Sequence, residues 1–236
     1  MSLEEARREL RKFANKKKAK VLQGFFKTGP GEYAEGEIFL GVGVPDIRQV
    51  CAKARNLSIK DVLGLLKSPI HEERLLAVFI LISKYTKAEV KEKEKIYNLY
   101  LKHTRFINNW DLVDLSAPNI VGAFLSDKNK QPLYKLARSN LIWERRIAIL
   151  ATFYFLKNKK FKETLKISRL LIFDKHDLIH KAAGWMLREI GKRDHLTEEL
   201  FLDKYSAVMP RTMLRYAIER FSEEKRVRYL KVKLKK

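Results

Sequence analysis

The feature that most constrains the fold is a weak internal repeat. Four segments of this 236-residue chain share a charged start, a small residue and a bulky apolar run, and their small residues are Ala77, Ala148, Ala183 and Ala217. These alanines are 71, 35 and 34 residues apart, and residues 109–114 lie near the middle of the widest gap. A period of about 35 residues is typical of a helix–turn–helix unit, which buries its apolar face only by stacking on its neighbours. The repeat therefore predicts an α-solenoid.

The remaining sequence pattern also favours an all-α fold. Apolar residues recur at helical spacing, no long alternating run is present, and the chain has only 10 glycines and 6 prolines. We expect one domain over residues 1–236, with an N-terminal helix and loop over 1–44, repeats over about 45–225 and a basic tail over 226–236. The alternative is an irregular helical bundle in which the spacing is a coincidence.

The charge of the chain indicates a polyanionic partner. Its 50 lysines and arginines exceed its 28 aspartates and glutamates, which gives a formal net charge of +22. So large a surplus repels itself, and nucleic acid is the first partner that offsets this repulsion, with an anionic membrane surface second. A solenoid of helical repeats forms a curved face, and a basic concave face is a natural channel for duplex DNA.

The sequence excludes several other classes of protein. Cys51 is the only cysteine, so neither an intrachain disulfide nor a cysteine zinc cage can form. No run of about 18 uncharged apolar residues is present, so we expect no membrane span. The start of the chain is acidic and lacks the apolar segment of a secretory signal, so we expect a cytoplasmic protein.

Two motifs resemble ligand sites, and we give both a structural interpretation. Residues 41–45 look like a phosphate-binding glycine loop, but the third glycine and the surrounding βαβ pattern are missing. His176 and His180 have the i, i+4 spacing of a zinc pair, but no third ligand is evident and Asp177 suits the first turn of a helix. We therefore expect neither a bound nucleotide nor a metal.

Residues 109–114 are the best candidate for chemistry. Trp110 and Asp114 are four residues apart and share one face of a helix. Each of the three tryptophans, Trp110, Trp143 and Trp185, falls within one repeat, and an indole is often simply part of the core. Indole rings beside a carboxylate also form a trap for a cation, because the ring face and the carboxylate both attract positive charge.

A cation trap in a basic protein indicates a positive group carried by a polyanion. A purine alkylated on a ring nitrogen is such a group, and its positive charge makes it a good leaving group. Hydrolysis of its N-glycosidic bond develops positive charge on the sugar. One carboxylate can stabilise that charge and orient a water molecule, without a second carboxylate acting as general acid.

The sequence resembles the AlkD-type DNA alkylation-repair glycosylases over nearly its whole length. This family is built from HEAT-like helical repeats. The segments that carry the resemblance are residues 25–33, 39–45, 109–114, 143–146, 181–189 and 209–212. The resemblance implies that the protein removes N-alkylated purines such as 3-methyladenine and 7-methylguanine from duplex DNA, without a metal or nucleotide cofactor.

The resemblance also assigns roles to individual residues. Asp114 matches the catalytic carboxylate of the family, and Trp110 and Trp185 match its two site aromatics. Arg146 matches an arginine near the backbone of the lesion, and Tyr33 matches a tyrosine at the cleft. Arg146 also has a structural interpretation, as a partner of Glu144 or of a neighbouring helix. Further phosphate-binding candidates, each also readable as a solvated helix charge, are Arg145, Lys181, Arg188 and Arg211.

Two other classes of function fit parts of the sequence. A non-catalytic repeat protein that recognises bent or branched DNA needs the charge and the solenoid but not Asp114. A protein-binding helical scaffold, a role common among repeat proteins, predicts weak salt dependence. The glycosylase is the function we predict, acting in base excision repair as a monomer, because a solenoid with a channel for a polyanion needs no partner subunit.

Overall fold

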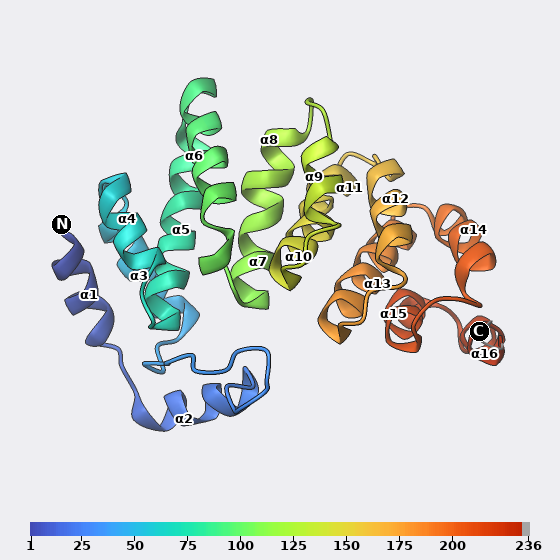
Figure 1. Cartoon of the computed structure of the whole chain (residues 1–236), viewed down its shortest axis with the longest axis horizontal. Coiled ribbons are helices and arrows are strands. Elements are labelled where there is room, and N and C mark those ends of the chain that lie inside the picture. Colours follow the sequence, from blue (N-terminus) through green and yellow to red (C-terminus); the bar gives the residue numbers. More distant parts are fainter. Residues whose placement is uncertain (233–236) are drawn as a thin grey trace. The chain divides into compact units, whose positions relative to one another are not determined.

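A computed structural model of the chain describes residues 1–232 and confirms the predicted all-α fold (Figure 1). Over that range the only extended pairing is a single bridge between Ile38 and Ile70. No helix within it is long and apolar enough to cross a membrane. By their contacts the residues form two compact units, which we call the N-terminal unit (Met1–Ser116) and the C-terminal unit (Ala117–Lys236).

The N-terminal unit is built around α5, which packs against α3, α4, α6 and α7. Its first helix has a capping box, in which Ser2 and Glu5 bond each other's backbone N–H groups. The elements of this unit are α1 (Leu3–Arg11), α2 (Lys16–Phe25), α3 (Val44–Ala54), α4 (Ile59–Leu66), α5 (His71–Lys87), α6 (Val90–Lys102), η1 (Thr104–Phe106) and α7 (Trp110–Ser116).

The C-terminal unit is built around α10 and α13, which pack against each other. Its elements are η2 (Ala117–Gly122), α8 (Ala123–Leu125), α9 (Gln131–Leu136), α10 (Ile142–Ala151), α11 (Phe153–Leu156), α12 (Lys162–Leu171), α13 (Asp177–Gly191), α14 (His195–Tyr205), α15 (Arg211–Ala217), η3 (Ile218–Arg220) and α16 (Glu223–Lys231). The predicted basic tail over 226–236 begins inside α16, and its residues 233–236 lie outside the described part of the chain.

The alanines of the sequence repeat are all fully buried on helices. Ala77 lies on α5, Ala148 on α10, Ala183 on α13 and Ala217 on α15. The stretch 109–114, placed by the spacing alone, forms the start of α7. The repeat therefore marks the buried helices of the fold, as the sequence predicts.

One glycine shows how closely these helices approach. Gly184 on α13 faces α15, and a Cβ atom added to it would lie 2.4 Å from the carbonyl oxygen of Met213 and 2.6 Å from the Cβ of Tyr216. Gly122 is in the same situation, because an added Cβ would lie 2.1 Å from the carbonyl oxygen of Ala151. Backbone atoms cannot move aside as a flexible side chain does, so both helix contacts require glycine.

We predict that Gly184→Ala destabilises the protein. The added methyl group forces α13 and α15 apart, and overpacking of this kind costs about 1–3 kcal/mol. The matched control is Gly24→Ala in α2, where nothing lies within 4 Å of an added Cβ. Urea unfolding should give a lower midpoint for Gly184→Ala and an unchanged or higher midpoint for Gly24→Ala. Equal midpoints for the two variants would contradict the close contact.

Candidate functional site

Trp110 begins α7 and is held by aromatic rings from the end of α2. Its ring stacks on Phe26, with centroids 5.2 Å apart and planes 15° apart. Phe25 meets the same indole edge-on at 5.9 Å. The indole N–H donates a hydrogen bond to the hydroxyl oxygen of Tyr33, 3.2 Å away. Trp110 is half-buried, so part of its ring remains open to solvent.

The loop after α2 brings Tyr33 back to this indole. The chain turns through positive φ at Lys27 (55°) and Gly31 (74°). Two backbone bonds close the turn: the N–H of Ala34 bonds the carbonyl of Lys27, and the N–H of Gly36 bonds that of Thr28. The glycine-rich segment that carries part of the family resemblance is therefore the support of Trp110.

Asn109 caps the start of α7 from a fully buried position. Its backbone carbonyl accepts the first helical bond, from the N–H of Val113 at 3.1 Å. Its side-chain oxygen accepts the N–H of Trp110 at 2.7 Å, and its amide nitrogen donates to Glu37 at 3.3 Å. These three bonds tie the buried asparagine both to α7 and to Glu37.

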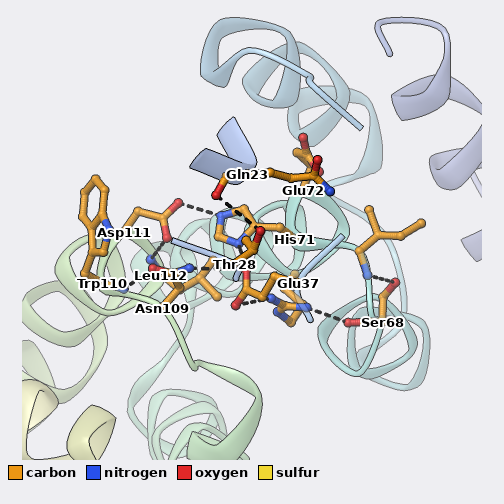
Figure 2. A network of polar contacts seen from close by, with 12 residues as sticks. Gln23, Thr28, Glu37, Ser68, His71, Glu72, Asn109, Trp110, Asp111 and Leu112 are labelled. Atoms are coloured by element: carbon orange, nitrogen blue, oxygen red, sulfur yellow. Dashed lines mark hydrogen bonds and ion pairs between the residues drawn. The ribbon is translucent and has the colours of Figure 1, made fainter. Parts of the chain in front are cut away.

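The buried imidazole of His71 links two carboxylates (Figure 2). Its Nδ1 lies 2.7 Å from Oε2 of Glu37, and its Nε2 lies 2.8 Å from Oδ2 of Asp111. Burial opposes a charged imidazole, but the hydrogen bonds and charges of Asp111 and Glu37 raise the pKa of His71 to about 9. At neutral pH the ring is therefore an imidazolium that donates to both carboxylates.

Arg74 completes this buried cluster on the far side of Glu37. Its Nη2 lies 2.8 Å from Oε1 of Glu37, an ion pair without hydrogen-bond geometry, and its Nη1 donates to the carbonyl of Ser68 at 3.0 Å. Burial works against ionisation of Glu37, but the hydrogen bond from His71 and the charge of Arg74 hold its pKa below the ordinary value. Two cations thus face two carboxylates, and this balance offsets the cost of burying them.

The glycine loop at residues 41–45 holds an internal carboxylate. The N–H groups of Leu40, Gly41 and Val42 all donate to Glu72 at 2.8–3.2 Å. Gly41 has a φ of 80°, and an added Cβ would lie 2.1 Å from the carbonyl oxygen of Asn15. The loop therefore binds an anion that the chain itself supplies, which agrees with its structural interpretation.

A cavity of about 380 Å³ lies beside this network. Apolar side chains of α2, α3, α5 and the loop between α2 and α3 form much of its wall, and its charged or titratable lining residues are Lys17, Lys18, His71, Glu72 and Asp111. The helix α2, which forms one wall of the cavity, has no buried residue of its own.

Asp114 lies one turn after Trp110 on α7, as the sequence predicts, and is half-buried. The buried hydroxyl of Tyr100 hydrogen-bonds the hydroxyl of Ser116 at 2.7 Å. Burial and then the negative charge of Asp114 raise the pKa of Tyr100, which places the carboxylate near that phenol.

The other predicted site residues belong to the C-terminal unit. Trp185 on α13 is half-buried, lies 6.0 Å from Phe153 between ring centroids, and donates its indole N–H to Glu189 at 3.3 Å. Arg146 is buried and donates to the carbonyl oxygen of Leu178 at 2.5 Å. Trp143, the third tryptophan, is buried.

The four further phosphate-binding candidates all have partners within the C-terminal unit. Arg145 forms a two-point ion pair with Asp174, and Arg188 pairs with Glu219. Lys181 pairs with Asp177 at 2.8 Å, and its side chain is 39% exposed. Arg211 donates to the carbonyl oxygen of Leu230 at 2.5 Å. Lys181 is more exposed than Arg145 (19%) and Arg188 (16%).

His176 and His180 both serve the start of α13. The side chain of His176 accepts the N–H of Leu178 at 3.2 Å as the helix cap. His180 contacts the carbonyl oxygen of Asp174 at 2.5 Å. Within residues 1–232 no group of three or more metal-ligating side chains comes together.

Sequence reasoning did not single out the chain Glu37–His71–Asp111. A signal for part of it was present, since His71 begins the repeat helix α5 and Trp110 begins the next, α7. Neighbouring repeat helices place their starts side by side, so polar residues at those starts meet. Nothing in the sequence pattern marks Glu37, which reaches His71 because the loop residue Ile38 accepts the N–H of His71 at 2.9 Å.

The comparisons with known proteins agree with this architecture. A family model described as DNA alkylation repair enzyme matches residues 6–221, and the chain belongs to this family. The resemblance noted in the sequence is thereby confirmed.

One solved structure, described as a predicted DNA alkylation repair enzyme from Enterococcus faecalis, has a similar fold. The two chains superpose with a TM-score of 0.68 at 14% identity, over 89% of this chain and 97% of the other. At this identity the likeness shows the fold alone. No curated protein matches the chain.

We predict that His71 makes stability depend on pH. Its pKa is raised from 6.5 to about 9, so its contribution is complete below pH 6.5 and is lost as the pH rises through about 9. The loss amounts to about 3 kcal/mol of unfolding free energy. Urea unfolding between pH 6 and pH 10 measures it, by comparing the wild type with His71→Gln.

The quantity to compare is the difference in unfolding free energy between the two proteins at each pH, because Glu198 also titrates. Burial raises the pKa of this glutamate from 4.5 to about 8, so it makes stability fall as the pH rises towards 8, which overlaps the lower part of the measured range. Both proteins share that slope. If wild type and His71→Gln lose the same free energy between pH 6 and pH 10, the imidazole is not charged in the folded protein.

Proposed function

We propose that the protein is a monofunctional DNA glycosylase that acts in base excision repair. It hydrolyses the N-glycosidic bond of cationic N-alkylated purines, of the 3-methyladenine and 7-methylguanine type, in duplex DNA. The observation that carries the proposal is the pairing on α7 of the half-buried indole of Trp110 with the carboxylate of Asp114 one turn later. Membership of the DNA alkylation repair enzyme family supports the choice of substrate.

The proposed reaction needs one carboxylate. The bond between the sugar C1′ and the purine nitrogen breaks, its electron pair stays with the purine, and the base leaves neutral. Asp114 stabilises the positive charge that develops on the sugar and orients the water molecule that adds to C1′. The proton of that water passes to the carboxylate or to solvent. A purine that already carries a positive charge needs no general acid, and the proposal includes no metal or other cofactor.

The indoles add a smaller attraction for the same positive charge. We assign Trp110 and Trp185 contacts with the alkylated nucleotide or its sugar, each worth about 0.5–2 kcal/mol through the ring face. Phe26 and Tyr33 hold the indole of Trp110 in place, so its contact with the nucleotide requires no ordering when DNA binds.

The net charge of +22 supports duplex DNA as the partner. We assign phosphate contacts to Lys181 first, because its ion pair with Asp177 is partly exposed and can exchange for a phosphate. Tyr33, Arg145, Arg146, Arg188 and Arg211 stay in the proposal as weaker DNA contacts. We propose that the enzyme acts as a monomer in the cytoplasm.

We predict that Asp114→Asn removes the activity and leaves DNA binding intact. The amide cannot stabilise the charge on the sugar, so single-turnover release of methylated purines should fall about 100-fold or more. The matched control is Asp127→Asn, because the side chain of Asp127 is 77% exposed and pairs with its neighbour Lys128. This control should release bases at the wild-type rate.

Two outcomes would redirect the proposal. Wild-type rates from Asp114→Asn would remove the catalytic role of this residue. Tight binding of bent or branched DNA by the wild type, with no release of base from any alkylated duplex, would establish a non-catalytic DNA-binding protein instead.

We also predict a steep dependence of DNA binding on salt. Several phosphate contacts release several counterions, so the affinity should fall about 10³-fold or more between 50 and 200 mM salt. Fluorescence anisotropy with a labelled duplex measures this change. An affinity that does not vary with salt would favour a protein-binding scaffold.

A further inference from the structure

We propose that His71 is a positioning residue for the excision reaction: by joining Glu37 to Asp111 it fixes the first turn of α7, and with it the directions of Trp110 and Asp114. The inference rests on the proposed function, because it concerns the same site. It adds a residue that does not touch the substrate.

His71 acts only through other residues. Its side chain is 3% exposed, and both ring nitrogens lie within 2.8 Å of a carboxylate oxygen. A DNA strand therefore has no access to the ring. Any effect of His71 on the reaction must pass through Glu37, Asp111 or the rings packed against it.

The imidazole connects three segments that are distant in the sequence. His71 begins α5, Glu37 lies in the loop before α3, and Asp111 lies in the first turn of α7. The loop is tied to α5 by the bond from the N–H of His71 to the carbonyl of Ile38. The side chain of His71 then ties α5 to the first turn of α7 through Asp111.

The two residues on either side of Trp110 in the sequence, Asn109 and Asp111, both belong to this hydrogen-bond network. Asn109 donates to Oε2 of Glu37, which also accepts from His71, and Asp111 accepts from the other side of the same imidazole. Trp110 therefore stands between two residues that are anchored to one buried imidazole (Figure 2).

The aromatic rings make a second connection between His71 and the indole. Phe26 lies 5.0 Å from the ring of His71 and 5.2 Å from that of Trp110. Phe39 also stacks on the ring of His71, with the two ring centroids 4.6 Å apart. The indole is thus held through its backbone by hydrogen bonds and through its ring by stacking, and both routes begin at His71.

The same anchoring reaches the proposed catalytic carboxylate. Asp111 and Asp114 are three residues apart in one helix, so they are neighbours on its surface and move together. A displacement of about 1 Å at a reacting group can cost about 100-fold in rate. Loosening the start of α7 should therefore lower kcat far more than it weakens DNA binding.

The charged groups around His71 define how this device responds to pH. Glu37 faces the ring from the loop and Asp111 from α7, while Arg74 on α5 neutralises the outer oxygen of Glu37. Lys17 and Lys18 of α2 and Glu72 of α5 line the same cavity as the ring. When His71 loses its proton, only one ring nitrogen still carries a hydrogen. The lone pair of the other nitrogen then faces a carboxylate oxygen of Asp111 or Glu37, and that contact becomes repulsive.

The sharpest test is the variant Asp111→Asn. The amide of this variant can donate to Nε2 of a neutral His71 whose Nδ1–H still donates to Glu37, so the network stays complete without a charge. We expect wild-type base release to fall as the pH rises through about 9, and we expect Asp111→Asn to keep its rate over that range. Single-turnover rates on the same methylated duplex measure this difference, and any titration of the substrate is common to both proteins.

A second variant tests the positioning itself. His71→Gln can donate to only one of the two carboxylates, so kcat should fall about 100-fold at neutral pH while the Kd for DNA changes less than about threefold. The matched control is His195→Gln, because His195 is 47% exposed on α14 in the C-terminal unit. An unchanged kcat in a folded His71→Gln protein overturns the proposal, as does an alkaline decline in Asp111→Asn equal to that of the wild type.

One readout separates this inference from the proposed function. Carbon-13 signals of labelled tryptophan, with those of Trp110 identified by Trp110→Phe, report the indole's position without any reaction. They should shift through about pH 9 in the wild type and stay constant in Asp111→Asn. Constant signals in both proteins overturn the positioning role even if the protein is a glycosylase, and a shift in the wild type alone supports it even if no base is released.

Discussion

The N-terminal unit depends on one buried imidazolium held between two carboxylates. Burial alone would keep His71 neutral, yet Glu37 and Asp111 lie within 2.8 Å of its two nitrogens, and their attraction outweighs the desolvation. Arg74 balances the remaining charge. Removing the imidazolium would leave two carboxylates facing the single charge of Arg74 in the interior, so the cluster favours the meeting of the start of α5, the loop before α3 and the start of α7.

Within this fold, the faces of the helices and the starts of the helices have different roles. The repeat supplies buried helices at regular intervals, with alanine or glycine where two helices touch, as at Ala183 and Gly184. The polar clusters sit at the starts of these helices, where backbone N–H groups and short side chains are free to bond. Glu72 binds the loop at residues 40–42 in this way, and Asn109 caps α7. The helix faces hold the protein together, while the helix starts orient the residues proposed to act on DNA.

The sequence predicts the helices well because their signal is local and repeated. A small residue every 35 residues or so, within an apolar run, identified α5, α10, α13 and α15, and the gap between the first two correctly placed α7. The pair Trp110 and Asp114 could be predicted for the same reason, because residues four positions apart share one face of a helix.

The rest of the site depends on contacts that no spacing encodes. Glu37 and Asp111 are 74 residues apart in the chain and meet only because a loop crosses the start of α5. The charge candidates Arg145 and Arg188 looked like phosphate ligands in the sequence, but both are engaged by acidic residues, Asp174 in the loop before α13 and Glu219 in η3. A basic residue in a sequence does not reveal its partner, and in this chain the partner decides how exposed the charge is.

The most direct test of the account is to identify what the wild-type protein releases from methylated duplex DNA. We expect mass spectrometry of the small-molecule fraction to detect free 3-methyladenine and 7-methylguanine, with one abasic site left in the duplex for each base released. Methylated DNA that is bound but keeps all its modified bases would contradict the account.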